Sequence, residues 1–324
     1  MKSTETKFSK QSIIEAVEKI QLLISVGNYP NNKDLIKICA GQNINLIDGR
    51  SEPHLIHEIL ETAVNCHLLQ TFNTETTKKE NNFEILAELE YLTKSLPTQS
   101  WRGEDQLVYQ QFSTPPPVAF VMAKLLKPEK EDIALEPSAG TGCLALWVKI
   151  AGCQTFVNEI SERRRLLLEI QNFAPTAVNA EFLDDLLPNE IKPDLILMNP
   201  PFSASCGKIK KTDSDFGFRH VKSALVRLNK NGRLVALLGS DALLKTDKGR
   251  KFLGEIGTEY DLKAVFTLPQ NTFYKYGTSI RTAIICIEKR EPERNKSRIE
   301  QRKIPLEIYC HSLENCLAFA EIPD

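Results

Sequence analysis

The sequence contains no long apolar run. No stretch of its 324 residues approaches the roughly 18–20 apolar residues that a membrane span requires. The first ten residues, Met1 to Lys10, are polar and lack the apolar segment of a signal peptide. We therefore expect neither a membrane protein nor a secreted one, and a cytoplasmic location.

Cysteine pairs are also missing. The eight cysteines are spread along the chain and none forms a CxxC pair, so the sequence indicates neither a zinc site nor a disulfide framework. Most of them have apolar neighbours, as Cys286 does between Ile285 and Ile287. We expect reduced, mostly buried thiols and no bound metal.

An excess of one charge is missing as well. The 41 Lys and Arg residues are balanced by 42 Asp and Glu residues, which gives a net charge of −1. The chain as a whole therefore has no electrostatic attraction to nucleic acid, and such binding depends on local patches. One candidate is the run from Lys289 to Lys303, which has seven basic and three acidic residues. It is either a solvated tail or an arm that contacts phosphates.

The pattern of apolar residues changes near residue 105. Residues 1–105 carry apolar residues at helical spacing, such as Ile13, Val17 and Ile20, and predict a helical N-terminal region. Residues 106–290 instead alternate short apolar runs with segments of helix length. Residues 291–324 are assigned to a basic C-terminal tail.

The alternation in residues 106–290 predicts an open α/β sheet of about seven strands with flanking helices. Such sheets bind ligands at the carboxyl ends of their strands. The expected strands are Ile133–Glu136, Thr155–Asn158, Ala177–Phe182, Asp194–Met198, Arg233–Gly239, Leu262–Leu268 and Thr282–Glu288. The expected helices are Val118–Leu126, Cys143–Ala151, Ser161–Phe173, Phe218–Leu228 and Thr246–Ile256.

A loop with two glycines follows the first expected strand. The residues Glu136-Pro-Ser-Ala-Gly-Thr-Gly142 close this strand and open a helix. Gly140 and Gly142 permit a tight turn and the close approach of a ligand, and the helix offers free N–H groups. The loop is not a P-loop, because the required Lys and Ser or Thr are absent. Glu159 follows the second strand, where a carboxylate can accept hydrogen bonds from both hydroxyls of a ribose. These features predict a cofactor that contains a nucleoside.

The most informative pattern is Asp194-Leu-Ile-Leu-Met-Asn-Pro-Pro-Phe202. An apolar strand ends in Asn199, two prolines and an aromatic ring. Prolines do not extend a central strand, so the Asn199 side chain and the Pro200 carbonyl project from its end. They form two hydrogen-bond acceptors aimed at one point, as a planar amino group requires. Phe202 offers a face on which a flat base stacks.

These residues resemble the S-adenosylmethionine-dependent methyltransferases that act on adenine N6 in DNA. Asn199-Pro-Pro-Phe202 matches their catalytic motif, and Glu136–Gly142 resembles their cofactor loop. Gln111-Phe-Ser-Thr-Pro115 is similar to the segment that lies over the methionine end of the cofactor. Its place before the glycine loop is typical of gamma-ordered enzymes and of the modification subunits of type I restriction systems. Residues 108–290 also resemble the methylase-like domain of strawberry-notch-like mobile-element proteins.

The resemblance implies a class I methyltransferase-like fold, S-adenosylmethionine as cofactor and DNA as partner. It also implies that an acid after the third strand binds the adenine of the cofactor. Glu181, followed by Phe182, fits that role by position, and Asp184 is the alternative. The residues that the resemblance assigns to cofactor binding are Gln111, Phe112, Thr114, Glu136, Pro137, Ala139, Gly140, Thr141, Gly142, Glu159, Glu181 and Phe182. Those that it assigns to catalysis are Asn199, Pro200, Pro201 and Phe202.

The implied activity is site-specific methyl transfer to adenine N6 in DNA, with the base flipped out of the duplex. Two alternatives remain open. One is transfer to an amino group of protein glutamine or RNA guanine, and the other is a non-catalytic accessory module of a mobile element. Only 35 residues follow Lys289, too few for the recognition domain of gamma-ordered enzymes. We therefore expect other segments, or a separate specificity or helicase-like partner, to select the target.

Overall fold

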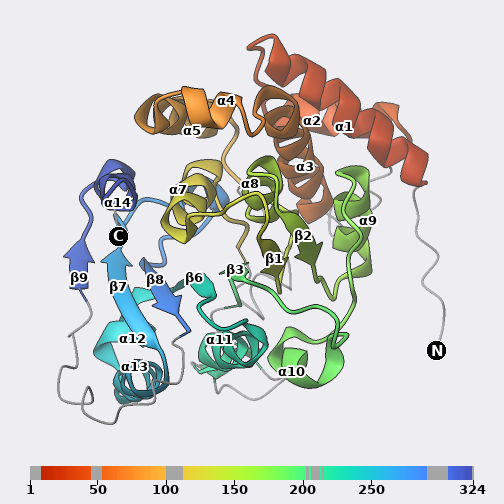
Figure 1. Ribbon diagram of the computed structural model, residues 1–324. Helices are drawn as coiled ribbons and strands as arrows, with labels where there is room; N and C mark the ends of the chain where they lie inside the picture. The colour runs from red at the N-terminus through yellow and green to blue at the C-terminus, as the bar shows by residue number, and fades with distance from the viewer. Residues whose placement is uncertain are drawn as a thin grey trace.

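Helices make up the N-terminal part of the chain, and the rest alternates between helices and strands (Figure 1). The computed structural model describes residues 9–44, 53–99, 112–201, 204–205, 212–213, 215–289 and 306–322. The helices before residue 100 are α1 (Lys10–Ser25), α2 (Asn32–Gly41), α3 (Pro53–Thr71), α4 (Thr76–Lys79) and α5 (Asn82–Ser95). They confirm the helical N-terminal region.

Strands and helices alternate in the following part. From residue 116 to 198 the elements are α7 (Pro116–Leu126), β1 (Ile133–Glu136), α8 (Ala145–Ile150), β2 (Gln154–Val157), α9 (Glu162–Ile170), the 3-10 turn η1 (Ala180–Phe182), α10 (Leu183–Leu186) and β3 (Leu195–Met198). After the short pair β4 (Ala204–Ser205) and β5 (Thr212–Asp213) come α11 (Phe216–Arg227), β6 (Arg233–Gly239), α12 (Ser240–Lys245), α13 (Asp247–Glu259), β7 (Asp261–Thr267), the 3-10 turn η2 (Tyr274–Tyr276), β8 (Thr282–Glu288), β9 (Leu306–Tyr309) and α14 (Leu313–Ala320).

The seven strands of the main sheet follow the order β2-β1-β3-β6-β8-β7-β9. β2, β1, β3 and β6 pair in parallel, whereas β8 runs antiparallel to both of its neighbours, β6 and β7. All four residues of β3 are apolar and buried, because helices cover both faces of the sheet at this strand. The predicted open α/β sheet of about seven strands is confirmed.

The two faces of the sheet are covered by different helices. Because side chains alternate along a strand, Leu195 and Leu197 of β3 join one core and Ile196 and Met198 the other. The first core includes residues of α7, α8 and α14, and the second includes residues of α10, α11 and α13. Figure 1 shows these two helical layers on opposite sides of the strands.

The N-terminal helices share the first of these cores. Ile59 and Val64 of α3 are buried in the same cluster as Leu146 of α8 and Leu167 of α9. In Figure 1, α3 runs down beside α8 and α9, next to the edge of the sheet formed by β2. This packing places α3 close to the loop that follows β1. No helix within the described ranges is long and apolar enough to span a bilayer.

One predicted strand is wrong. The described residues 177–182, expected to be the third strand, form no strand; an isolated bridge joins Asn158 to Thr176, and the turn η1 follows. The cause is the Asn158 side chain, whose Nδ2 donates to the Val178 carbonyl and whose Oδ1 accepts from the Val178 N–H, both at 2.9 Å. A single amide thus occupies the backbone groups that a neighbouring strand would pair.

β9 supplies the seventh strand instead. It comes from the stretch that the sequence assigns to a C-terminal tail, and it pairs in parallel with β7. α14 follows it and buries Leu313, Cys316 and Leu317 in the first core. Residues 290–305, which contain most of the basic run, lie outside the described residues.

Candidate active site

The carboxyl ends of three parallel strands bring polar site residues to one edge of the sheet. Glu136 is the last residue of β1, Glu159 follows β2 by two residues, and Asn199 follows β3 directly. β1 lies between β2 and β3, and its Glu136 is in register with Val157. Because the three strands run in the same direction, their ends form the edge at which such sheets bind ligands.

The loop after β1 turns through two glycines in the left-handed region. Gly140 has a φ of 55° and Gly142 a φ of 92°. A Cβ at Gly142 would lie only 2.9 Å from Leu168 Cδ2, whereas a Cβ at Gly140 would meet no atom within 4 Å. Gln171 Nε2 also donates to the Thr141 carbonyl at 2.8 Å. The loop is therefore fixed closely against α9.

We expect Gly142→Ala to destabilise the protein by about 1–3 kcal/mol, because the backbone is strained for alanine and the methyl group has no space. The free energy of unfolding from denaturant titration measures this loss. Gly140→Ala is the matched control, since its φ is also positive but its surroundings are open. An equal loss in both variants would contradict the role of close packing against α9.

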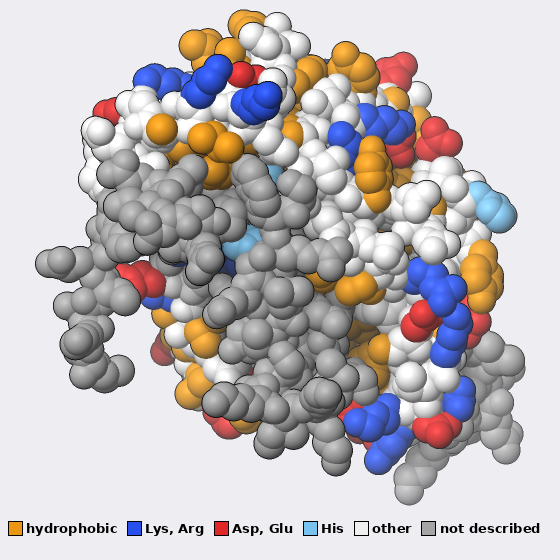
Figure 2. All heavy atoms as spheres, turned by 180° about the vertical axis from the view of Figure 1, so that it is seen from behind, with side chains coloured by type: hydrophobic (Ala, Val, Ile, Leu, Met, Phe, Trp, Pro, Cys, Tyr) orange, Lys and Arg blue, Asp and Glu red, His pale blue; other side chains and the backbone are white. Residues whose placement is uncertain are grey.

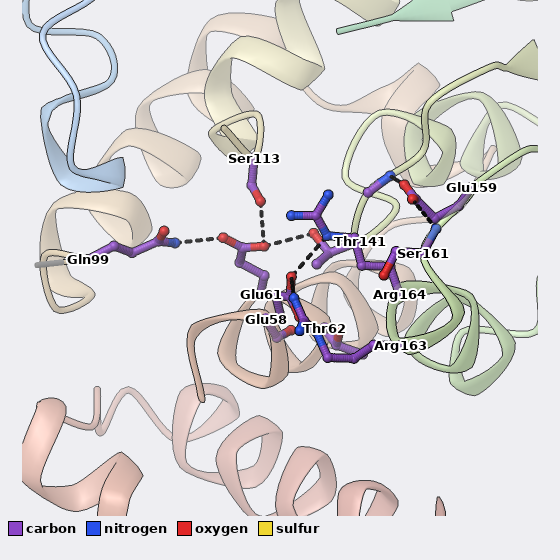
Figure 3. A network of polar contacts seen from close by, with 11 residues as sticks. Glu58, Glu61, Thr62, Gln99, Ser113, Thr141, Glu159, Ser161, Arg163 and Arg164 are labelled. Atoms are coloured by element: carbon purple, nitrogen blue, oxygen red, sulfur yellow. Dashed lines mark hydrogen bonds and ion pairs between the residues drawn. The ribbon is translucent and has the colours of Figure 1, made fainter. Parts of the chain in front are cut away.

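Glu159 is buried, and both of its carboxylate oxygens are anchored by backbone N–H groups (Figure 3). Oε2 accepts from Gly140 and Oε1 accepts from Ser161, each at 2.8 Å. A carboxylate has about four lone-pair positions, so further acceptor capacity remains on each oxygen. This arrangement suits two neighbouring hydroxyl groups.

Glu136 provides a second buried carboxyl group in the same place. Its Oε2 accepts from the Ala145 N–H at the start of α8 at 2.7 Å. Burial raises the pKa of this carboxyl group well above its usual value, which the Ala145 hydrogen bond opposes and the charge of Glu159 reinforces. A cation placed beside Glu136 would favour its ionised form.

Asn199 is oriented by the segment that precedes α7. Its Nδ2 donates to the Phe112 carbonyl at 2.8 Å and to Thr114 Oγ1 at 3.0 Å. Because a backbone carbonyl can only accept, the atom that faces Phe112 is the amide nitrogen. Both N–H groups are engaged, and this leaves Oδ1 as an acceptor on the opposite side of the amide.

The two prolines after Asn199 are buried and closely supported. A Cβ at Gly217, in the first turn of α11, would lie 3.3 Å from the Pro201 carbonyl oxygen and 3.9 Å from Pro200 Cγ. Gly217 therefore allows α11 to pack directly on this corner. The contact restricts movement of the backbone that carries the Pro200 carbonyl.

The two candidate acids for the cofactor adenine have other partners. Glu181 Oε1 accepts from Arg219 Nε of α11 at 2.5 Å, and Asp184 Oδ1 accepts from Ser223 Oγ at 3.1 Å. Phe182 is 47% exposed. Neither acid is among the described residues that line the pocket at the strand ends. The choice between Glu181 and Asp184 stays a prediction.

This pocket joins the glycine loop, the segment before α7 and the end of β3. The predicted residues that line it are Phe112, Thr114, Glu136, Ala139, Gly140, Thr141, Glu159, Asn199 and Pro201. Pro137, Gly142 and Pro200 are described but do not belong to its lining, and Gln111 and Phe202 lie outside the described residues. The lining residues that the sequence did not single out are Ser113, Ser138, Cys143, Leu144 and Arg164.

Arg164 of α9 brings a cation to the pocket. Its Nε donates to Glu58 Oε1 of α3 at 2.9 Å, and Glu58 Oε2 also accepts from Arg163 Nε at 2.6 Å. Burial disfavours the charged guanidinium, but Glu58 and Glu159 raise the pKa of Arg164 above its usual value. Three consecutive arginines after Glu159 are its only signal in the sequence, and they do not distinguish a buried cation from a solvated helix face.

Comparison with protein families bears on the part of the site that contains Asn199. The model of the family described as N-6 DNA Methylase matches residues 166–304. The matched range contains Asn199-Pro-Pro-Phe202 and the strands β3 to β8. The resemblance to adenine-N6 DNA methyltransferases is confirmed.

A known restriction enzyme and methyltransferase is similar to this chain in sequence. The type II restriction enzyme and methyltransferase RM.BcgI of Heyndrickxia coagulans is 25% identical over 208 residues, which cover 56% of this chain and 32% of that protein. This chain therefore matches about a third of the length of that relative.

Two solved structures share the fold. A class I S-adenosylmethionine-dependent methyltransferase from Listeria monocytogenes is similar with a TM-score of 0.54 and 15% identity, over 96% of this chain and 98% of the other. A modification subunit of a type I restriction enzyme from Vibrio vulnificus YJ016 gives 0.50 and 16%, over 83% and 66%. These identities support the fold alone, and the class I methyltransferase-like fold is confirmed.

Proposed function

We propose that this chain transfers a methyl group from S-adenosylmethionine to the N6 amino group of adenine in DNA. The observation that carries the proposal is the orientation of Asn199, whose N–H groups are held by Phe112 and Thr114. Its Oδ1 is then an acceptor at the edge of a pocket that also contains Glu159. The match to the N-6 DNA Methylase family supports the same chemistry.

The polar groups of the pocket fit this cofactor. Glu159 offers acceptors for the two ribose hydroxyls, and the positive-φ glycine loop brings backbone close to them. The buried carboxyl of Glu136 suits the ammonium group of the methionine part, and Arg164 suits its carboxylate. When bound, S-adenosylmethionine supplies an electrophilic methyl group on a positively charged sulfur.

Asn199 and Pro200 would act on the amino group of the base. The exocyclic nitrogen of adenine is a weak nucleophile, because its lone pair is delocalised into the ring. Asn199 Oδ1 accepts one N–H and the Pro200 carbonyl accepts the other, which directs the lone pair out of the ring plane. The lone pair would then face the methyl group that bound S-adenosylmethionine would supply, and the N–H proton that the amine gives up would pass to solvent water. Catalysis rests on positioning and electrostatics, with no strong base.

Labelling distinguishes this activity from its alternatives. The protein is incubated with methyl-labelled S-adenosylmethionine and with unmethylated DNA, RNA or cell lysate. We expect label in DNA, recovered as N6-methyladenine after digestion. Label found only in RNA or protein would favour the glutamine or guanine alternative. Cofactor binding without any transfer would favour an accessory module, and either result would contradict the proposal.

The surface charges of the described residues are mixed on one face of the molecule. On the face shown in Figure 2, basic and acidic side chains of the described residues lie interspersed. Many of the lysines are paired, as Lys248 is with Asp215 at 2.7 Å and Lys263 with Glu288 at 2.7 Å. Paired charges attract phosphates weakly. We propose that a specificity or helicase-like partner takes part in target selection, in keeping with the likeness to a modification subunit of a type I restriction enzyme.

A further inference from the structure

A carboxylate on α3 is hydrogen-bonded to both the glycine loop and the segment before α7, which line the pocket. Glu61 Oε2 accepts from Thr141 Oγ1 of the glycine loop at 2.9 Å and from Ser113 Oγ at 2.7 Å (Figure 3). Its Oε1 accepts from Gln99 Nε2 at 2.6 Å. Glu61 is only 8% exposed. One buried side chain of the N-terminal region thus joins three segments that lie far apart in the sequence.

The contact with Ser113 leads directly to the catalytic amide. Ser113 lies between Phe112 and Thr114, the two residues that accept the N–H groups of Asn199. A shift of Ser113 would therefore move both acceptors that orient Asn199. The same oxygen of Glu61 also fixes Thr141 of the glycine loop. One oxygen of Glu61 therefore anchors both the glycine loop and the segment that orients the amide.

We propose that Glu61 is a positioning residue whose shared oxygen anchors both the glycine loop and the segment that orients Asn199. This inference rests on the function proposed above. All three partners of Glu61 donate hydrogen bonds to it, so an acceptor-only carboxylate satisfies each of them. Removal of this shared acceptor would leave buried donors unpaired in both segments. Burial raises the pKa of this carboxyl group, and the hydrogen bonds from Ser113 and Gln99 lower the pKa in part.

Asn65, one turn further along α3, provides a matched comparison. Its Nδ2 donates to the Thr141 carbonyl at 2.7 Å, so it holds the glycine loop as Glu61 does. The carbonyl keeps its second donor, Gln171, when Asn65 is replaced. The described contacts of the Asn65 side chain do not include the segment 112–114. Asn65→Ala therefore loosens the loop and leaves the orientation of Asn199 intact.

The two positions separate cofactor affinity from turnover. We expect Glu61→Ala to raise the Kd for S-adenosylmethionine about 10-fold and to lower kcat at saturating cofactor about 10-fold. Asn65→Ala is expected to raise the Kd by about 3-fold and to leave kcat unchanged. Glu61→Gln keeps one oxygen for Ser113 and Thr141, and a rotated Gln99 amide can pair with its NH2 group. Its kcat and Kd are expected within about 3-fold of the wild type. Calorimetry gives the Kd and methylation of DNA gives kcat.

Hydrogen exchange tests whether Glu61 anchors both segments, without turnover. In the cofactor-free protein, we expect Glu61→Ala to speed exchange in peptides covering residues 112–114 and 139–142. We expect Asn65→Ala to speed it in residues 139–142 only. If Glu61→Ala does not fold, Ser113→Ala replaces it, with faster exchange expected in residues 112–114 and lower kcat at saturating cofactor. Thermal unfolding establishes which variants are folded.

The outcomes separate this inference from the proposed function. If the wild type binds no S-adenosylmethionine or methylates no adenine in DNA, the proposed function itself fails. If the wild type is active and Glu61→Ala changes only the Kd, or changes neither quantity, the role of Glu61 as an anchor of both segments is overturned. A loss of activity in Glu61→Gln as large as that in Glu61→Ala also overturns it. Faster exchange in only one of the two segments of Glu61→Ala does so as well.

Discussion

Asn199→Ala is expected to lower kcat by at least about 100-fold, while the Kd for S-adenosylmethionine stays within about 3-fold of the wild type. The side chain lines the pocket beside the glycine loop, but its amide nitrogen is bonded to the protein and its oxygen is left for the substrate. Its removal takes away the acceptor that the proposed mechanism assigns to the adenine amino group, without touching Glu159 or Glu136. Single-turnover methylation of DNA with labelled cofactor measures the rate, and calorimetry measures binding.

Thr114→Val is the matched control for the orientation of this amide. It removes one of the two acceptors for Asn199 Nδ2 and keeps the Phe112 carbonyl, with a side chain of similar shape. We expect kcat to fall by about 10-fold, the worth of a single hydrogen bond to a group that still has its second anchor. Near-normal activity of Asn199→Ala would contradict the mechanism of amino methylation. Equal activities of Thr114→Val and the wild type would contradict the orienting role of the segment before α7.

The parts of the site that could be predicted from the sequence are those whose chemistry is local. Glu136, Glu159 and Asn199 each stand within two residues of a strand end, and parallel strands align those ends by geometry. The residues that support them could not be found this way. Glu61 and Thr141 are 80 positions apart, and they meet only because α3 packs against the layer that contains α8. A buried Glu in an amphipathic helix has no local signal that separates it from a solvated one.

The sheet shows the same limit. Six of the predicted strands are present, and in five of them most residues are buried, so their apolar runs need a core whatever their neighbours are. The predicted third strand has a strand-like composition, but the Asn158 side chain takes the Val178 N–H and carbonyl, and Asn179 caps the turn η1 by accepting from Glu181 N–H. β9 was not predicted, since it follows a strongly charged run and its pairing with β7 is long-range. Side-chain competition for backbone groups and long-range pairing both depend on the folded context.

Glu159→Ala is expected to weaken the binding of S-adenosylmethionine by about 100-fold, which corresponds to about 2.7 kcal/mol. The ribose hydroxyls would lose their acceptor, and so would the Gly140 and Ser161 N–H groups. Since the chemical step depends on Asn199, kcat at saturating cofactor is expected to stay within about 3-fold. The two variants therefore change different quantities: Glu159→Ala raises the Kd, and Asn199→Ala lowers kcat. Calorimetry and saturation kinetics on both proteins measure the contrast.

Two controls define what the Glu159 carboxylate contributes. Glu159→Gln keeps one oxygen, so it satisfies either Gly140 or Ser161 but turns an N–H group toward the other, and we expect a loss of about 10-fold in affinity. Glu162→Ala removes a nearby carboxylate that is exposed on α9 and is expected to leave binding unchanged. Unchanged affinity of Glu159→Ala would remove Glu159 from the ribose site. A similar loss in Glu162→Ala would mean that general electrostatics, and not the two anchored oxygens, explains the effect.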